Sequence, residues 1–189
     1  VIIIDNLSMG KVENIPKGAT FIKEDILDES ILKEIVPSVD IIFHQAAKVS
    51  IRESVKQFFD DANNNLMGTL NLLKACCNSP VKRFIYASSS SVYGVKDEPE
   101  VTEDLPLEPL TDYSKYKAKC EEIILSEATD DFEVVVIRPS TVCGYSPRLR
   151  LDLTVNILTN HAVNTGKITV FGGEQKRPNL HIEDMTDLY

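Results

Sequence analysis

The chain has 189 residues, of which 43% are hydrophobic and 26% are charged, a composition typical of one globular domain. Its formal net charge is −9, which argues against binding of nucleic acid or of an anionic membrane surface, because both need clustered positive charge. No apolar stretch approaches the roughly 18 residues that span a bilayer, and no signal sequence opens the chain. We therefore expect a cytoplasmic protein without a nucleic-acid or membrane partner.

The cysteines and histidines show no spacing typical of a metal site. The 4 cysteines contain no CxxC pair, and we expect them to be reduced thiols. The 3 histidines, His44, His161 and His181, have no ligand spacing among them. The sequence therefore predicts structural histidines and no bound metal.

Short apolar runs alternate with helical patterns along the chain. The runs predict strands buried on both faces, as in a parallel sheet; they cover residues 1–4, 19–22, 39–43, 81–86 and 132–137. The helical patterns cover residues 29–36, 59–77 and 112–127. Such alternation predicts an α/β fold with a doubly wound parallel sheet.

The pattern changes after Arg138 and Pro139. We expect a loop to Arg150, an amphipathic stretch at 151–164, a short strand at 168–171 and a helix from Ile182. Residues 1–140 then form the main domain, and residues 141–189 begin a small substrate-binding lobe. The chain starts within a strand and stops within a helical pattern, so we expect missing sequence on both sides.

Two sequence segments carry chemistry. Tyr113 and Lys117 are four residues apart on a predicted helix, so both side chains project from one face. A nearby ammonium favours the phenolate, which makes the tyrosine a usable base at neutral pH. Upstream, a strand ends in the run Ser88-Ser89-Ser90-Ser91, and the carboxyl ends of parallel strands are where α/β sheets bind ligands.

These segments, in this order and followed by a strand that ends in Arg138-Pro139, resemble the extended short-chain dehydrogenases, in particular the sugar-nucleotide epimerase and dehydratase family. The resemblance implies a Rossmann-like fold and NAD as the cofactor. It assigns catalysis to Ser89, Tyr113 and Lys117, with Lys117 also holding the nicotinamide ribose.

The resemblance also implies a set of cofactor contacts. Asp5 resembles the carboxylate that accepts both hydroxyls of the adenosine ribose; it would repel a 2′-phosphate, which favours NAD over NADP. Asp25-Ile26 resembles the adenine-contacting pair, and Asn65 the asparagine that supports the active site. The full predicted cofactor set is Asp5, Asn6, Asp25, Ile26, Gln45, Ala46, Ala47, Asn65, Ala87, Ser88, Tyr113, Lys117 and Pro139.

The family's glycine-rich turn, which grips the pyrophosphate at a helix N-terminus, is expected just upstream of Val1. We therefore expect the 189 residues alone to bind NAD weakly. For the substrate, the resemblance implies a nucleotide-diphosphate sugar, with Arg177 on the diphosphate through its bidentate fork. The full predicted substrate set is Ser89, Ser90, Thr141, Arg148 and Arg177.

The dehydratases of this superfamily carry an acidic pair where this chain has Ser90 and Ser91, which disfavours dehydration. The predicted reaction is epimerisation by transient oxidation and re-reduction. The alternatives are an NAD-dependent reductase or dehydrogenase of an activated sugar, and a catalytically silent NAD-binding scaffold.

We also expect a homodimer, formed by the helix after Asn63 and the helix that carries Tyr113. Both are apolar on more than one face: Met67 and Leu72 are expected to point away from the sheet, and Tyr116, Ile123 and Ile124 do not all fit one stripe with Cys120. A two-fold contact would bury them.

Overall fold

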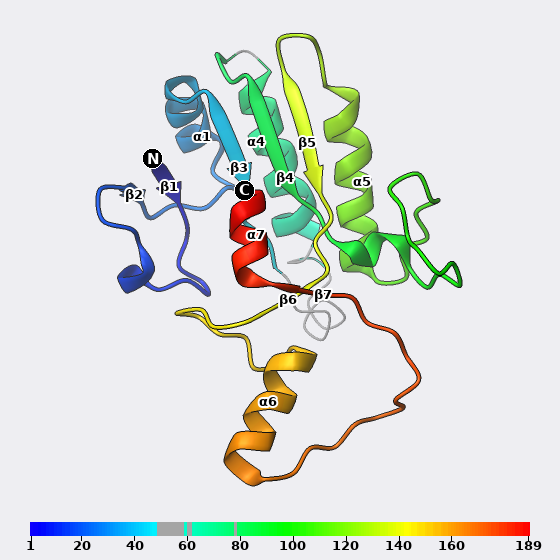
Figure 1. Ribbon diagram of the computed structural model, residues 1–189. Coiled ribbons are helices and arrows are strands. Elements are labelled where there is room, and N and C mark those ends of the chain that lie inside the picture. The colour runs from blue at the N-terminus through cyan, green and yellow to red at the C-terminus, as the bar shows by residue number, and fades with distance from the viewer. Residues whose placement is uncertain (49–58, 60–61, 78) are drawn as a thin grey trace. The chain divides into compact units, whose positions relative to one another are not determined.

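The computed structural model describes residues 1–48, 59, 62–77 and 79–189 (Figure 1). The chain divides into two compact units, Val1–Arg138 and Pro139–Tyr189. Among the described residues, no helix is both long enough and apolar enough to cross a membrane.

Parallel strands form the centre of the first unit. They are β1 (Ile2–Ile4), β2 (Thr20–Ile22), β3 (Ile41–His44), β4 (Arg83–Ala87) and β5 (Glu133–Ile137). β1 pairs with β2, and a second sheet has the order β3-β4-β5, with every pairing parallel. Each strand lies within two residues of a run that the sequence predicted, which confirms the α/β class.

The helices of the first unit begin at recognisable caps. Asp28 accepts a hydrogen bond from the Ser30 amide at the start of α1 (Glu29–Ile35), and Thr111 forms a capping box with Ser114 at the start of α5 (Asp112–Ser126). Between them, the π-helical turn Ala62–Met67 continues into α4 (Gly68–Cys76). The earlier start predicted for this helix includes residues 60 and 61, which lie outside the described residues.

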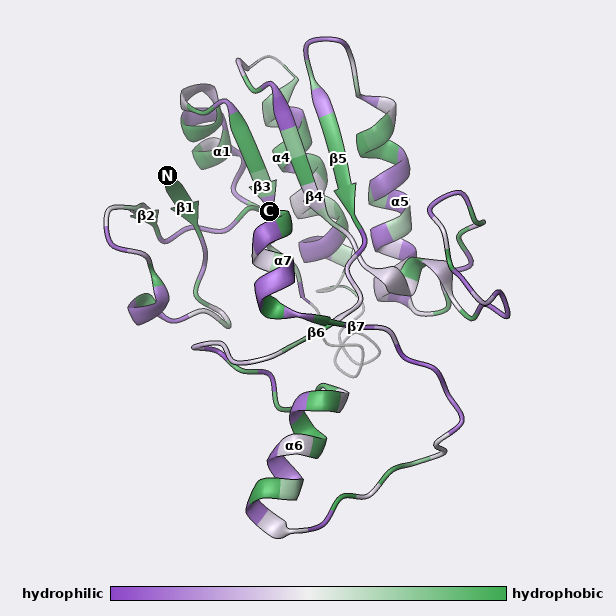
Figure 2. Cartoon of the chain, viewed as in Figure 1, coloured by the Kyte–Doolittle hydropathy of each residue, from purple (hydrophilic) through white to green (hydrophobic). Residues whose placement is uncertain are grey.

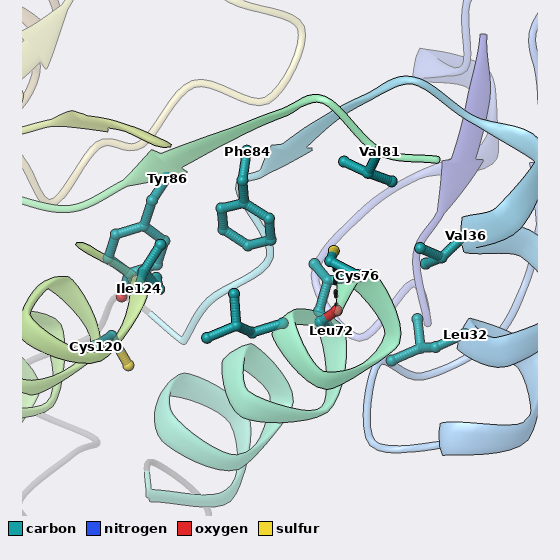
Figure 3. Packing of buried hydrophobic residues seen from close by; sticks show 10 residues of the cluster. Leu32, Val36, Leu72, Cys76, Val81, Phe84, Tyr86, Cys120 and Ile124 are labelled. Carbon is teal, nitrogen blue, oxygen red and sulfur yellow. Dashed lines mark hydrogen bonds between the residues drawn. The ribbon is translucent and has the colours of Figure 1, made fainter. Parts of the chain in front are cut away.

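The three helices meet one face of the sheet through a continuous apolar core (Figure 3). Side chains alternate along a strand, so Phe84 and Tyr86, both fully buried, point to the same side of β4. They belong to one buried cluster with residues of all three helices, namely Leu32, Leu72, Leu73, Cys76, Cys120 and Ile124. Figure 2 shows the strands as hydrophobic and the helices as mixed, which is the pattern of helices that cover a sheet on one side.

Leu72 corrects one sequence prediction. It was expected to point away from the sheet, but it is buried in the core cluster. The reason is that α4 contacts α1 and also contributes to the core cluster that includes strand residues, so its buried face is wider than one stripe.

The second unit contains two short parallel strands and two helices. β6 (Thr141–Cys143) pairs with β7 (Asn179–His181), and the helices are α6 (Thr154–Thr165) and α7 (Ile182–Leu188). α6 ends at Gly166, whose left-handed φ of 66° suits a residue without a Cβ.

The predicted strand at 168–171 is wrong, and β6 was missed within the predicted loop. Ile168, Val170 and Phe171 have strand-like composition, but they are exposed and pair with no strand. Strand formation depends on the pairing partner more than on local propensity, and in this unit β6 pairs with β7 instead.

Candidate active site and cofactor pocket

A cavity of about 170 Å³ lies where β1, β2 and β3 end. Seven of the thirteen residues predicted to bind the cofactor line it: Asp5, Asn6, Asp25, Ile26, Gln45, Ala46 and Ala47. We call it the cofactor pocket. Its position at the carboxyl ends of parallel strands is the usual ligand position in α/β sheets.

A larger, open depression of about 520 Å³ lies at the opposite ends of the strands, around the amino ends of β4 and β5. Asp130, Asp131 and Glu133 line it, and none of the predicted site residues does. Since parallel sheets bind ligands at the carboxyl ends of their strands, we place the site in the smaller cavity.

Short-range hydrogen bonds shape the loops of the cofactor pocket. Asp5 Oδ1 accepts from the Leu7 amide at 2.6 Å, and Asn6 Oδ1 accepts from the Ser8 amide at 2.9 Å, both of which are Asx turns. Asn6 Nδ2 donates to Asp25 Oδ2 at 2.8 Å, which ties the loop after β1 to the loop after β2. The Asp5 carboxylate is thereby held at the mouth of the pocket.

The helix that contains Asn65 secures the far side of the pocket. The Asn65 side chain accepts from the Lys48 amide at 2.9 Å and donates to the Lys48 carbonyl at 3.0 Å. These two hydrogen bonds hold the backbone of the loop after β3 in place. Gly68 lies against Ile26: a Cβ at Gly68 would lie 2.4 Å from Ile26 Cδ1. The glycine therefore permits the close approach of α4 to the pocket.

His44, at the end of β3, is buried beneath the pocket. Its Nε2 lies 2.8 Å from Thr69 Oγ1, and burial, with the charge of Lys117 as a smaller cause, lowers the pKa of His44 to about 3. His44 is therefore neutral at physiological pH.

Lys117 is the buried cation among the predicted catalytic residues, whose surroundings we call the catalytic region. Its side chain is 3% exposed, and its Nζ donates to the Ala87 carbonyl at 2.7 Å. Nζ lies 4.6 Å from the centre of the Tyr86 ring and 6.0 Å from that of Tyr113. The aromatic faces and the carbonyl stabilise the charge of Lys117 away from water.

The serines after β4 have distinct environments. Ser88 is buried, and its hydroxyl donates to the Glu121 carboxylate. Ser89 caps the 3₁₀ turn Ser90–Tyr93, and its Oγ accepts from the Ser91 amide at 3.2 Å and from the Ser91 hydroxyl at 2.9 Å. That turn packs against α5, so the helix that carries Tyr113 and the loop that carries Ser89 are neighbours.

The remaining predicted residues lie in the second unit. Pro139 is its first residue, and Thr141 begins β6. Arg148 and Arg177 are exposed. Arg150, the other arginine of that loop, is paired with Asp152 through contacts of 3.1 and 2.7 Å. The substrate roles of Thr141, Arg148 and Arg177 stay predictions.

The parallel strands and the helices that cover them form an α/β unit, and comparison with known families shows which family the chain belongs to. The model of the NAD-dependent epimerase/dehydratase family matches residues 1–189. The chain belongs to this family.

The similar proteins include several epimerases. A UDP-glucose 4-epimerase of Lactobacillus helveticus is 28% identical over 207 residues, which cover all of this chain and 63% of the relative. Two solved structures superpose closely, and both confirm the Rossmann-like fold. One is a UDP-N-acetylglucosamine 4-epimerase from Methanobrevibacter ruminantium in complex with UDP-N-acetylmuramic acid (TM-score 0.87, 32% identity, 98% of this chain and 62% of that chain). The other is a UDP-glucose 4-epimerase from Thermus thermophilus in complex with NAD (TM-score 0.84, 28% identity, 98% and 64%). The chain thus spans less than two thirds of the length of these relatives.

The structure places further residues, which the sequence did not single out, beside the predicted catalytic residues. Tyr86 lies under the Lys117 ammonium, and Glu121 and Arg138 form an ion pair behind the serine loop. Glu121 could have been found: it follows Lys117 by four residues, which places a carboxylate on the buried face of the same helix.

Proposed function

We propose that the complete protein is an NAD-dependent epimerase of a nucleotide-diphosphate sugar. The observation that carries this proposal is the buried Lys117, held between the rings of Tyr86 and Tyr113 at the end of β4. A solvated surface lysine would not be buried in this way, and a lysine so placed makes the neighbouring tyrosine a stronger acid and a usable base.

The residues of the cofactor pocket fit the adenosine end of NAD. The Asp5 carboxylate at the mouth of the cavity is an acceptor suited to ribose hydroxyls, and Ala46 and Ala47 leave the backbone accessible to a ligand. The same carboxylate disfavours the 2′-phosphate of NADP. We therefore propose NAD as the cofactor, with Asp5, Asn6, Asp25 and Ile26 at its adenosine end.

The proposed reaction uses few groups of this chain. Tyr113 takes the proton from a sugar hydroxyl, and Ser89 hydrogen-bonds the reacting oxygen. Lys117 lowers the cost of the phenolate and, through its ammonium, contacts the nicotinamide ribose. NAD, when bound, would supply the hydride acceptor and donor for the oxidation and the re-reduction. The Tyr113 hydroxyl then gives the proton back, so that no external base or reductant is consumed.

Epimerisation is proposed over dehydration because Ser90 and Ser91 offer no carboxylate next to Ser89. Elimination of water needs an additional acid and base at that position. A one-way reductase would use the same residues but consume external NADH, so its stoichiometry separates it from an epimerase.

The test is a substrate screen on the complete protein with UDP-, GDP- and dTDP-sugars. We expect one class to raise the melting temperature and to be converted to its epimer without net change in NADH absorbance. Arg177→Met is expected to weaken the binding of that nucleotide sugar and to leave the binding of NAD unchanged. Stabilisation by none of the nucleotide sugars, together with turnover of a simple alcohol, would contradict the proposed substrate class.

We further propose a cytoplasmic homodimer. Among the described residues all four cysteines are free thiols, in keeping with a reducing compartment. Met67 on the π-helical turn and Leu125 on α5 are 44% and 48% exposed, and a two-fold contact through these helices would cover them. Light scattering on the complete protein tests this: a dimer that Met67→Lys dissociates supports it, and a monomer contradicts it.

A further inference from the structure

A buried ion pair lies directly behind the serine loop. Glu121 on α5 is 1% exposed, and Arg138, at the end of β5, contacts both of its carboxylate oxygens. Arg138 Nε lies 3.1 and 3.0 Å from the two oxygens, and Arg138 Nη2 lies 2.6 Å from Oε2. This is the bidentate geometry in which an arginine fixes the plane of a carboxylate.

Arg138 is itself held on its other side. Its Nη1 donates to the Tyr93 hydroxyl at 2.8 Å and to the Glu103 carbonyl at 3.3 Å. Its guanidinium carbon lies 5.0 Å from the centre of the Tyr93 ring. Tyr93 ends the 3₁₀ turn that Ser89 caps, so the arginine connects the far end of that turn to Glu121.

Glu121 also forms a hydrogen bond with Ser88, at the beginning of the same loop. Its Oε1 accepts from the Ser88 hydroxyl, while the Ser88 amide donates to the Ile137 carbonyl of β5 at 2.8 Å. Ser88 is thereby fixed through both its backbone and its side chain, and it directly precedes Ser89.

Tyr113, Lys117 and Glu121 follow one another at intervals of four residues along one face of α5. Lys117 holds the Ala87 carbonyl and Glu121 holds the Ser88 hydroxyl. Two successive turns of the helix therefore hold two successive residues of the strand end, and Ser89 is the next residue.

We propose that Glu121, oriented by Arg138, is a positioning residue that sets the Ser89 hydroxyl relative to Tyr113. This inference rests on the proposed function, since it gives Ser89 and Tyr113 their roles in the reaction. Stability alone is a poor account of the pair, because a buried ion pair commonly adds little compared with apolar residues of similar size. The contribution of the ion pair in this site is to fix the orientation of the Ser88 hydroxyl, which donates to Glu121.

The test compares variants of Glu121 in the complete protein. In Glu121→Gln the amide oxygen still accepts from Ser88 and from Arg138 Nε, so kcat is expected to stay within threefold of wild type. Glu121→Met removes the acceptor, and kcat is expected to fall at least tenfold, while KM and the Kd for NAD change less than threefold. The matched control is Glu122→Met: Glu122 is the next residue, is exposed, and contacts Lys119 at 2.9 Å, and its substitution leaves kcat unchanged.

A second variant guards against misfolding caused by an unpaired Arg138. Glu121→Met/Arg138→Met removes both charges and is expected to keep its melting temperature close to that of wild type, with the same loss of kcat. Wild-type kcat in either folded Glu121→Met protein would overturn the inference. So would an equal loss in Glu121→Gln and Glu121→Met, because the charge and not the Ser88 contact would then matter.

A readout independent of activity separates this inference from the proposed function. Hydrogen–deuterium exchange of the amides of residues 89–93 is expected to be at least tenfold faster in Glu121→Met and unchanged in Glu122→Met. If wild-type protein converts no nucleotide sugar, the proposed function fails, and this exchange measurement still decides whether Glu121 orders the loop. Unchanged exchange in Glu121→Met would overturn the positioning role.

Discussion

The cofactor pocket and the catalytic region lie at the same ends of neighbouring strands, yet they are held together differently. In the pocket, Asp5 and Asn6 each accept from a backbone amide two residues away, Asn6 also donates to Asp25, 19 residues away, and the side chains of Asp5 and Asn6 are exposed. In the catalytic region, Lys117 reaches a carbonyl 30 residues away and Arg138 a hydroxyl 45 residues away, largely out of water.

The difference fits the two tasks of the proposed function. A ribose is bound by acceptors on loops, which short turns can present. Proton transfer needs groups held in fixed relative positions, and buried long-range contacts supply that rigidity. Substitutions in the catalytic region should therefore affect the rate of chemistry, and those in the pocket should affect affinity.

The largest expected effect is at the proposed base. Tyr113→Phe keeps the ring that packs beside Lys117 but removes the proton acceptor, and kcat should fall about a hundredfold to ten-thousandfold. The melting temperature and NAD affinity should stay near wild type. Tyr116→Phe, one turn away on α5, is the matched control. Tyr113→Phe turnover within a few-fold of wild type would assign the proton transfer elsewhere.

Asp5→Ala should lower the affinity for NAD rather than kcat. Loss of a charged acceptor for the ribose is expected to weaken NAD about ten- to a hundredfold and to narrow the preference for NAD over NADP, with kcat at saturating NAD little changed. Titration of both cofactors measures this. The control is Asp28→Ala, which removes the cap of α1 outside the pocket. Tighter binding of NADP than of NAD by wild type would refute the role of Asp5.

Gly68→Ala tests how closely α4 approaches the pocket. The new Cβ would lie 2.4 Å from Ile26 Cδ1, so Ile26 must move, at an expected cost of about 1–3 kcal/mol in the free energy of unfolding. Adding Ile26→Val removes the clashing methyl group and should recover part of that loss. Denaturant unfolding of the two single variants and the double variant gives the coupling; purely additive effects would contradict the contact.

The smallest expected effect is on the pH dependence of stability, and it concerns His44. Burial lowers its pKa to about 3, whereas the unfolded chain has a pKa near 6.5 at this residue. Below pH 6.5 the unfolded state binds a proton at His44 that the folded state does not bind. The free energy of unfolding therefore decreases as the pH is lowered. Between pH 6.5 and 5.5 the loss is about 1 kcal/mol.

His44→Gln should lack this part of the acid sensitivity, while substitution of the exposed His161 should retain it. Urea unfolding at the two pH values makes the comparison. An identical pH dependence in His44→Gln and wild type would show that His44 does not remain neutral when buried.

The sequence predicts the cofactor pocket better than the surroundings of the catalytic residues. Asp5, Asp25 and Gln45 each follow a recognisable apolar strand, so their order along the chain and the rule for parallel sheets place them together. Glu121 and Tyr86 are different: their contacts connect distant segments, and no local pattern specifies such pairs. The missed strand β6 has the same cause, because it exists only through its pairing with β7.

The most direct test of the central claim follows the hydrogen that the reaction moves. The complete protein, with NAD, is given the nucleotide sugar that the substrate screen selects, carrying deuterium at the carbon whose configuration is inverted. The account predicts that the epimer forms with its deuterium retained and without accumulation of reduced NAD, and that Tyr113→Phe abolishes this. Product formed in proportion to NADH consumed or produced would contradict it and identify a one-way dehydrogenase or reductase.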